Sequence, residues 1–203
     1  MKVYQVSVGP MQNFSYIVED ESTHETIVID PSWDLEKLIE IINEQNLNPK
    51  YIVNTHWHDD HTRGNEELAK ELSVNIVQHH ASQLKNDLTV SDGDSIKFGC
   101  SELVVYHTPG HSKDSICLVG DGKIFSGDTL FVGNCGRIDL PGGSAKELYH
   151  GLFDVIANLN DNLVLYPGHD YGSSPTSTIG KEKQTNPVMQ KISETEFIER
   201  MGG

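Results

Sequence analysis

Long apolar runs are missing from this sequence. None exceeds a few residues in the 203-residue chain, whereas a membrane-spanning helix needs about 20 consecutive apolar residues. We therefore expect no membrane-spanning segment and no membrane partner. Residues 1–4 lead directly into strand-like sequence, without the charged and then apolar leader of a secreted protein. We expect the protein to be cytoplasmic.

Cysteine is also scarce. The three cysteines, Cys100, Cys117 and Cys135, are an odd number and show no paired spacing. A disulfide framework needs an even set in a small secreted chain, so we expect free thiols that pack as small buried residues.

Basic residues are few for the size of the chain. Lys and Arg number 15 against 30 Asp and Glu, which gives a net charge of -15. Nucleic-acid binding requires clustered Lys and Arg, so this balance excludes nucleic acid as the expected partner. We expect a small-molecule partner; the oligomeric state is left open.

The length and the apolar pattern predict one mixed α/β domain, residues 1–203. A chain of this size forms one sizeable core, and 36% hydrophobic residues with 18 glycines suit an α/β protein. A hairpin is expected at Asp121-Gly122, between strands 116–119 and 124–125. The other expected strands are 3–8, 14–18, 26–29, 51–54, 75–78, 95–98 and 103–106. The expected helices are 64–72, 144–159 and one that begins after a cap at Ser32 or Asp34 and ends near 45.

One short stretch, residues 55–61, concentrates His and Asp. It contains His56, His58, Asp60 and His61, and it follows the buried strand expected at 51–54. The carboxyl end of such a strand is where open α/β sheets place their ligands. In an extended loop His56 and His58 point the same way, so both imidazoles can reach one ion. The stretch therefore predicts part of a metal site.

Three later segments supply further candidates in the same context. His111, Asp128 and His169 each follow an apolar strand-like run, and each is directly preceded by glycine. Glycine permits close backbone approach and unusual dihedral angles. One such segment is a weak signal, but its recurrence together with residues 55–61 predicts a metal centre built from several loops.

The order of these seven residues resembles the ligand set of the metallo-β-lactamase superfamily, and within it the glyoxalase II (hydroxyacylglutathione hydrolase) branch. The resemblance covers nearly the whole chain, to about residue 187. It implies an αββα sandwich, with two mixed β-sheets facing each other and helices on the outer faces. It also implies two metal ions, one bound by His56, His58 and His111, the other by Asp60, His61 and His169, with Asp128 as the bridge.

These ligands suit two divalent ions, with zinc as our first expectation and iron or manganese as the alternatives. Such metal pairs lie roughly 3.5–4 Å apart, and the hydroxide between them is a nucleophile at neutral pH. Asp60 is the expected catalytic residue because it can orient that hydroxide. We therefore expect a metallo-hydrolase that cleaves a thioester, ester or lactone.

The resemblance also implies substrate-binding residues. In glyoxalase II relatives, a Cys-Gly-basic segment and a tyrosine after the last histidine ligand contact glutathione; here they match Cys135, Arg137 and Tyr171. The Arg137 guanidinium suits a carboxylate of a glutathione conjugate, or it forms a structural salt bridge. Asp139 stands where those enzymes carry another tyrosine, and the sequence ends at Gly203, before their helical C-terminal segment.

The tail is also similar to that of persulfide dioxygenases. Residues 167–171, residues 177–180, Glu182 and Asn186-Pro187 carry this second resemblance. It implies one Fe(II) held by His56, His111 and Asp128, with open positions for oxygen, and a glutathione persulfide substrate. This is our alternative function, and a metal-binding protein without turnover is a third. Five histidines match no ligand position, and we expect them at the surface or beside the ligands: His24, His79, His80, His107 and His150.

Overall fold

The first ninety residues form one six-stranded sheet in the computed structural model, which describes residues 1–202. Its strands lie side by side in chain order, antiparallel from β1 to β3 and parallel from β3 to β6. They are β1 (Lys2–Val8), β2 (Asn13–Glu19), β3 (Glu25–Ile29), β4 (Asn48–Val53), β5 (Asn75–His79) and β6 (Leu88–Val90).

The next part of the chain forms a second six-stranded sheet. It is antiparallel from β7 to β10, parallel between β10 and β11, and antiparallel at β12. Its strands are β7 (Ser95–Phe98), β8 (Ser101–His107), β9 (Ile116–Gly120), β10 (Lys123–Gly127), β11 (Val164–Pro167) and β12 (Ser177–Thr178). Both sheets are therefore mixed, as expected.

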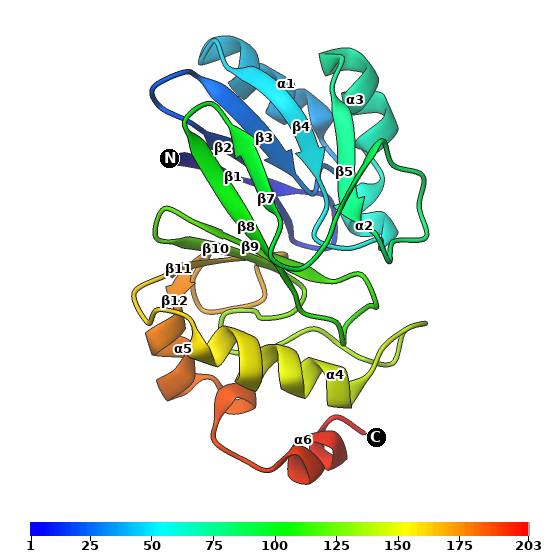
Figure 1. Cartoon of the computed structure of the whole chain (residues 1–203), viewed down its shortest axis with the longest axis vertical. Coiled ribbons are helices and arrows are strands. Elements are labelled where there is room, and N and C mark those ends of the chain that lie inside the picture. The colour runs from blue at the N-terminus through cyan, green and yellow to red at the C-terminus, as the bar shows by residue number, and fades with distance from the viewer. Residues whose placement is uncertain (203) are drawn as a thin grey trace.

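Helices cover the two outer faces (Figure 1). On the first sheet these are α1 (Leu35–Glu44) and α3 (Asn65–Leu72), while the short α2 (Asp59–Thr62) follows the β4 loop. On the second sheet they are α4 (Ala145–His150), α5 (Ile179–Thr185) and α6 (Glu194–Arg200). The αββα sandwich is confirmed.

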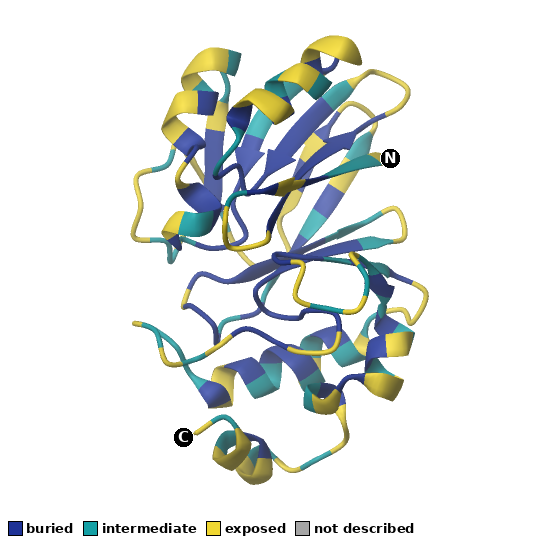
Figure 2. Cartoon of the chain, turned by 180° about the vertical axis from the view of Figure 1, so that it is seen from behind, coloured by how far each residue is buried: buried dark blue, intermediate teal, exposed yellow. Residues whose placement is uncertain are grey.

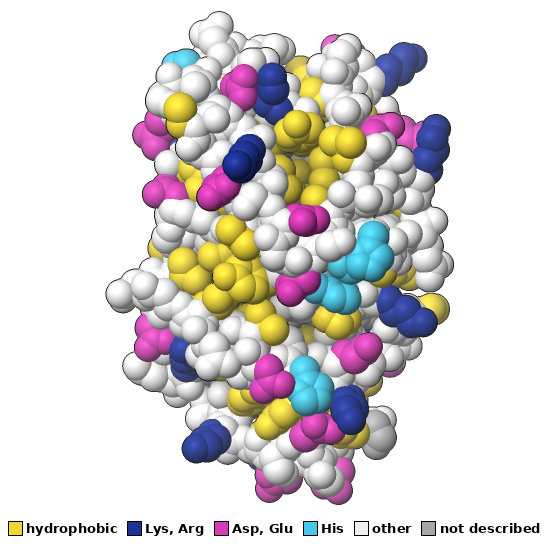
Figure 3. Space-filling view, in the orientation of Figure 1, with side chains coloured by type: hydrophobic (Ala, Val, Ile, Leu, Met, Phe, Trp, Pro, Cys, Tyr) yellow, Lys and Arg dark blue, Asp and Glu magenta, His cyan; other side chains and the backbone are white. Residues whose placement is uncertain are grey.

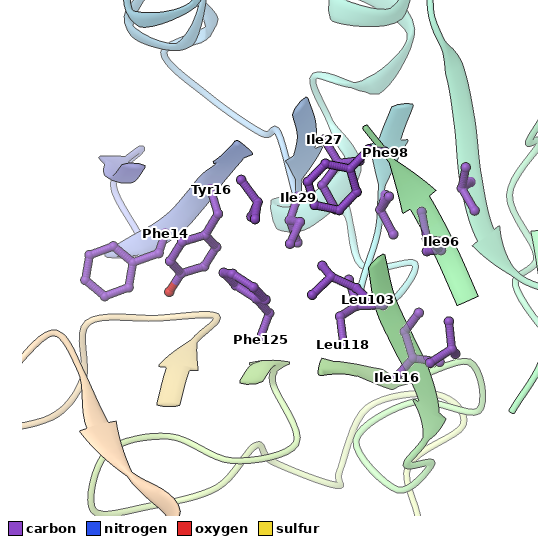
Figure 4. Packing of buried hydrophobic residues seen from close by; sticks show 14 residues of the cluster. Phe14, Tyr16, Ile27, Ile29, Ile96, Phe98, Leu103, Ile116, Leu118 and Phe125 are labelled. Atoms are coloured by element: carbon purple, nitrogen blue, oxygen red, sulfur yellow. The ribbon is translucent and has the colours of Figure 1, made fainter. Parts of the chain in front are cut away.

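The main core lies between the two sheets. Strand β3 shows how its sequence serves two cores, because Ile27 and Ile29 face the second sheet while Val28 packs under α1. A strand that is buried on both faces needs such a continuous apolar run. Figure 4 shows Tyr16 of the first sheet beside Phe125 of the second, with Phe14 on the other side of the Tyr16 ring.

Two further cores lie beneath the helices, so burial is highest in the sheets and on the inner sides of the helices (Figure 2). No helix within residues 1–202 is both long enough and apolar enough to cross a bilayer. On the face seen in Figure 3, Lys and Arg side chains are interspersed with Asp and Glu rather than gathered in one patch.

The structure confirms one local expectation and corrects several others. The expected hairpin is present, with positive φ angles at Asp121 (46°) and Gly122 (73°), as a two-residue turn between twisted strands requires. The expected cap of α1 is wrong. Asp34 occupies the N-cap position, but no side chain makes a capping hydrogen bond to the helix, and the Asp34 carboxylate pairs with Lys37 instead. Strands β6 and β12 and helices α5 and α6 were not expected, and Cys100 is exposed rather than buried.

Candidate metal centre

The seven predicted donors all lie in segments that follow strands. His56, His58, Asp60 and His61 come from the loop after β4 and from α2. Asp128 is the first residue after β10, whereas His111 and His169 lie in the loops after β8 and β11. The first four donors thus come from the first sheet and the last three from the second.

Three of the histidines form one group of donors. One nitrogen from each of His56, His58 and His111 lies within 4.8 Å of the other two, and all three side chains are buried. His58 Nδ1 is 2.9 Å from His111 Nε2. Tetrahedral ligands at metal–nitrogen distances near 2.0–2.1 Å are roughly 3.3 Å apart, so this spacing suits a shared ion.

A second group contains Asp60, His61 and His169, whose donor atoms also lie within 4.8 Å of one another. The Nε2 atoms of His61 and His169 are 3.2 Å apart, and Asp60 Oδ2 is 3.3 Å from His169 Nε2.

Asp128 lies between the two groups. Its Oδ2 is 3.5 Å from His111 Nε2 in the first group and 3.3 Å from His169 Nε2 in the second. Its Oδ1 is 3.3 Å from His61 Nε2. A carboxylate in this position can contact ions in both groups, which is the geometry a bridging ligand requires.

Unpaired buried atoms test whether these residues fit a metal ion. His56 Nε2 and Asp128 Oδ1 are buried without a hydrogen-bond partner among the described residues. An unpaired buried polar atom is costly, and a cation is a partner that imidazole nitrogens and carboxylate oxygens share. The donor set therefore fits divalent metal ions.

Neighbouring groups hold the imidazoles in one orientation through their other ring nitrogen. His111 Nδ1 lies 2.7 Å from the Arg137 carbonyl oxygen, and His169 Nδ1 lies 2.9 Å from that of Met11. Such contacts fix which nitrogen faces the metal.

Asp30 does the same for His61 and was not predicted. It lies at the end of β3, and its Oδ2 is 3.0 Å from His61 Nδ1. The same carboxylate accepts hydrogen bonds from the backbone and hydroxyl of Thr55, and that hydroxyl is 3.1 Å from His56 Nδ1. Asp30 directly follows an apolar strand, as Asp128 does, and this shared pattern is the signal that could have found it.

The charges of the metal-free site follow from burial and from the close carboxylates. Burial lowers the pKa of His58 to about 4 and that of His56 well below its usual value, so both are neutral. Burial would also lower the pKa of His169, but hydrogen bonding and charge attraction to Asp128 raise it to about 10. Burial would raise the pKa of Asp128, but the charges of His61 and His169 lower it to about 2. The metal-free site therefore pairs a protonated His169 with an ionised Asp128.

A cavity of about 280 Å³ opens beside these donors. The three expected substrate-binding residues, Cys135, Arg137 and Tyr171, line it together with His58, Asp60 and Asp128. The Tyr171 ring stacks on His169, with centroids 4.5 Å apart. The structure thus brings all three expected residues to the same cavity as the donors.

Two of these residues have specific surroundings. Burial raises the pKa of Cys135 to about 12, so its thiol stays protonated at neutral pH and is a poor nucleophile. Arg137 donates two hydrogen bonds to the Asp139 carboxylate, and both side chains are exposed. The guanidinium at the mouth of the cavity already has a carboxylate partner from its own chain.

The remaining histidines do not join either group of donors within residues 1–202. His79 is buried, and its ring stacks on that of His107 with centroids 4.0 Å apart. The ring of His80 also packs against the His79 ring, with centroids 4.2 Å apart. His79 is therefore buried rather than at the surface, in a stack of rings with His80 and His107.

The chain belongs to the metallo-β-lactamase superfamily. The model of that family matches residues 8–83 and 78–169. Fold, donor order and family model agree, which confirms the resemblance.

Relatives of two reaction types match most of the chain. Persulfide dioxygenase ETHE1, mitochondrial, of Homo sapiens is 35% identical over 193 residues, which cover 93% of this chain and 76% of the relative. Hydroxyacylglutathione hydrolase of Tolumonas auensis is 33% identical over 204 residues, which cover 98% and 78%. The cytoplasmic compartment expected for this chain stays a prediction, since one relative is mitochondrial.

Solved structures also match most of the chain. The crystal structure of ETHE1 from Myxococcus xanthus matches with a TM-score of 0.95 and 30% identity, covering 100% of this chain and 91% of that chain. TTHA1623 in a di-iron-bound form matches with a TM-score of 0.78 and 29% identity, covering 91% and 98%.

Proposed function

We propose that this protein is an iron-dependent persulfide dioxygenase that acts on glutathione persulfide. The observation that carries the proposal is the match to the M. xanthus ETHE1 structure over the whole chain, supported by the 35% identity to the human enzyme. The hydrolase that we expected first has weaker support from the comparisons, and the dioxygenase that we held as the alternative has stronger support.

The residues present suit this chemistry. Fe(II) bound by His56, His111 and Asp128 would supply oxygen activation, since two histidines and one carboxylate leave open coordination positions. These three residues meet beside the cavity. Asp60 also lines the cavity, and its carboxylate accepts a hydrogen bond from Asn13, so it is oriented to position a water molecule.

The overall reaction is balanced by oxygen and water. Both atoms of one O₂ are added to the outer sulfur of the persulfide, which is oxidised while O₂ is reduced. Water then breaks the sulfur–sulfur bond, so one persulfide, one O₂ and one H₂O give one thiol, one sulfite and two protons.

The test is to load the protein with iron under anaerobic conditions and then to measure its oxygen uptake in aerated buffer. With glutathione persulfide we expect one sulfite for each O₂ consumed. Absence of oxygen uptake by iron-loaded protein, with hydrolysis of S-lactoylglutathione by zinc-loaded protein, would overturn the proposal.

A thioester hydrolase with two metal ions is the second candidate. One specific observation favours it: the donors form two groups with Asp128 between them, which suits a metal pair. In this candidate Asp60, His61 and His169 bind the second ion, with zinc, iron or manganese as the metal. A metal-binding protein without turnover is disfavoured by the open cavity, because structural sites are usually closed.

Asp60→Ala separates the two candidates by metal content. A centre that works with one iron keeps its metal when Asp60 is lost, because Asp60 belongs to the other group of donors. A working pair of ions instead loses one equivalent together with its hydrolase activity. Metal analysis and both activity assays on the same preparation give the answer.

A further inference from the structure

Glu182 of α5 is a buried carboxylate outside the metal centre. Its side chain is 1% exposed, and no Lys or Arg of residues 1–202 forms an ion pair with it. A buried carboxylate without a cation must be stabilised by hydrogen bonds. The partners of Glu182 therefore show what it holds in place.

Three donors surround this carboxylate. Oε1 accepts a hydrogen bond from the Ser177 hydroxyl at 2.5 Å. Oε2 accepts one from the backbone N–H of Gly133 at 2.8 Å and one from the Asn186 amide at 2.9 Å. Gly133 belongs to the turn 131–134, so Glu182 links this turn to α5.

Asn186 holds the same turn at its two ends. It is fully buried, and its amide Nδ2 lies 3.2 Å from the Phe131 carbonyl oxygen and 3.1 Å from that of Asn134. The turn itself has one cross-link, the hydrogen bond from Phe131 N to the Asn134 oxygen. Most of the hydrogen bonds that fix the turn thus come from two residues, Glu182 in the middle of α5 and Asn186 at its C-cap.

The turn forms one wall of the cavity. Phe131 and Asn134 line it, and so does Cys135, the next residue. The Phe131 ring packs edge-on against His169, with centroids 5.7 Å apart, and against Tyr171 at 5.5 Å. A shift of the turn would therefore change the cavity directly beside the metal donors.

We propose that Glu182 and Asn186 are positioning residues that fix the 131–134 turn, and with it the cavity wall against which the sulfur-bearing end of the substrate binds. Neither side chain reaches the cavity, so both act through the turn. The substrate part of this statement rests on the proposed function, whereas the link between α5 and the turn does not.

The test combines hydrogen exchange with kinetics in Glu182→Ala. We expect amide exchange in residues 131–135 to become at least about tenfold faster, because the turn opens without its partner. We expect KM to rise about tenfold with kcat within about threefold, because the turn shapes the substrate cavity but supplies no metal donor. Metal content should stay at the wild-type value.

Two variants serve as matched controls. In Glu182→Gln the amide oxygen can accept from Gly133 and Asn186 while its NH₂ donates to the Ser177 hydroxyl, so exchange and KM should return to wild type. Lys183 lies on the same helix as Glu182, and Lys183→Ala removes its ion pair with Asp161. This variant should change neither the exchange rate nor KM.

Unchanged exchange in residues 131–135 of Glu182→Ala would overturn the proposal, as would an equal effect of Lys183→Ala. If Glu182→Ala does not fold, Asn186→Ala decides by the same measurement, because it leaves the carboxylate bonded to Ser177 and Gly133. Faster exchange with no turnover of any substrate would refute the proposed function alone.

Discussion

Asp128 is the residue on which both groups of donors depend. It is buried, and its two oxygens lie 3.3–3.5 Å from histidines of both groups. We predict that Asp128→Ala removes activity and most of the bound metal, whether one ion or two are used. Metal analysis of protein purified without chelator checks this.

His79→Ala is the control for that variant. It removes a buried imidazole that stacks on His107 and contributes no donor atom to either group. We predict that metal content and activity stay near wild type, while stability falls because a buried ring is lost. Loss of metal in this variant would mean that the donors are assigned wrongly.

His169 gives the metal-free protein a pH-dependent stability. Its pKa in the folded chain is about 10, above the usual value of 6.5, because of Asp128 and Asp60. A raised pKa stabilises the fold fully below the unfolded pKa, and this stabilisation is lost as the pH rises through the folded value.

We therefore predict that the free energy of unfolding of metal-free protein falls between about pH 6.5 and 10, whereas metal-loaded protein changes less. In metal-loaded protein the bound ion, rather than the proton on His169, is the positive partner of Asp128 and Asp60. Urea denaturation at several pH values measures both, and His169→Ala without metal should lose the effect. Equal pH dependence with and without metal would contradict this explanation.

At the scale of single residues, the sequence predicted the donors better than their supports. The donors share a visible pattern, an apolar strand followed by His or Asp, and glycine precedes three of them. Asn13 was missed because its contact with Asp60 joins residues 47 positions apart and nothing in its neighbourhood signals it. Such pairings arise from the packing of β2 beside the ligand loop.

The secondary-structure elements show where periodicity succeeds and where it fails. The apolar spacing of residues 144–159 predicts one regular helix, but the chain passes from α4 into a π-helical segment (Gly151–Val155) and a 3₁₀ segment (Ile156–Asn158). The apolar face persists through all three, because Leu148, Leu152 and Ile156 are fully buried. Spacing thus identified the buried face but not the change in winding.

Short polar elements gave too little pattern to predict. Strand β12 has two residues, and α5 and α6 have seven each. Helix α6 presents mainly Phe197 to the core, where it packs against Tyr149 and Phe153. Two adjacent apolar side chains, Phe197 and Ile198, in a polar segment do not define a helix in a sequence.

Phe197→Ala tests how α6 is held. The ring is 1% exposed, and truncating a buried phenylalanine costs about 3–5 kcal/mol. We predict a loss of that order in the free energy of unfolding with no change in metal content, since α6 contributes no donor. Denaturant unfolding and metal analysis measure the two effects, and loss of metal would show that α6 also supports the centre.

At the scale of the whole molecule, the metal centre lies where the two sheets meet. Four donors belong to the first sheet and three to the second, so an ion bound by His58 and His111 joins both. Binding that occurs only in the folded state stabilises that state.

We therefore predict that removal of metal by a chelator lowers the melting temperature, and that added metal restores it. The shift should be several degrees, because a ligand at about 100 times its dissociation constant adds about 2.7 kcal/mol. Calorimetry on metal-free and metal-loaded samples measures it. A melting temperature that does not depend on metal would show that the sheets need no such link.

The order of the strands has one more consequence, because each sheet is made from a continuous half of the chain. The only described connection between the sheets in sequence is the exposed turn 91–94. Opening the backbone there would leave two polypeptides, each with an uncovered apolar face and an incomplete set of metal donors. Their reunion would be driven by the apolar core between the sheets, and a metal ion bound by donors from both halves would strengthen the resulting heterodimer.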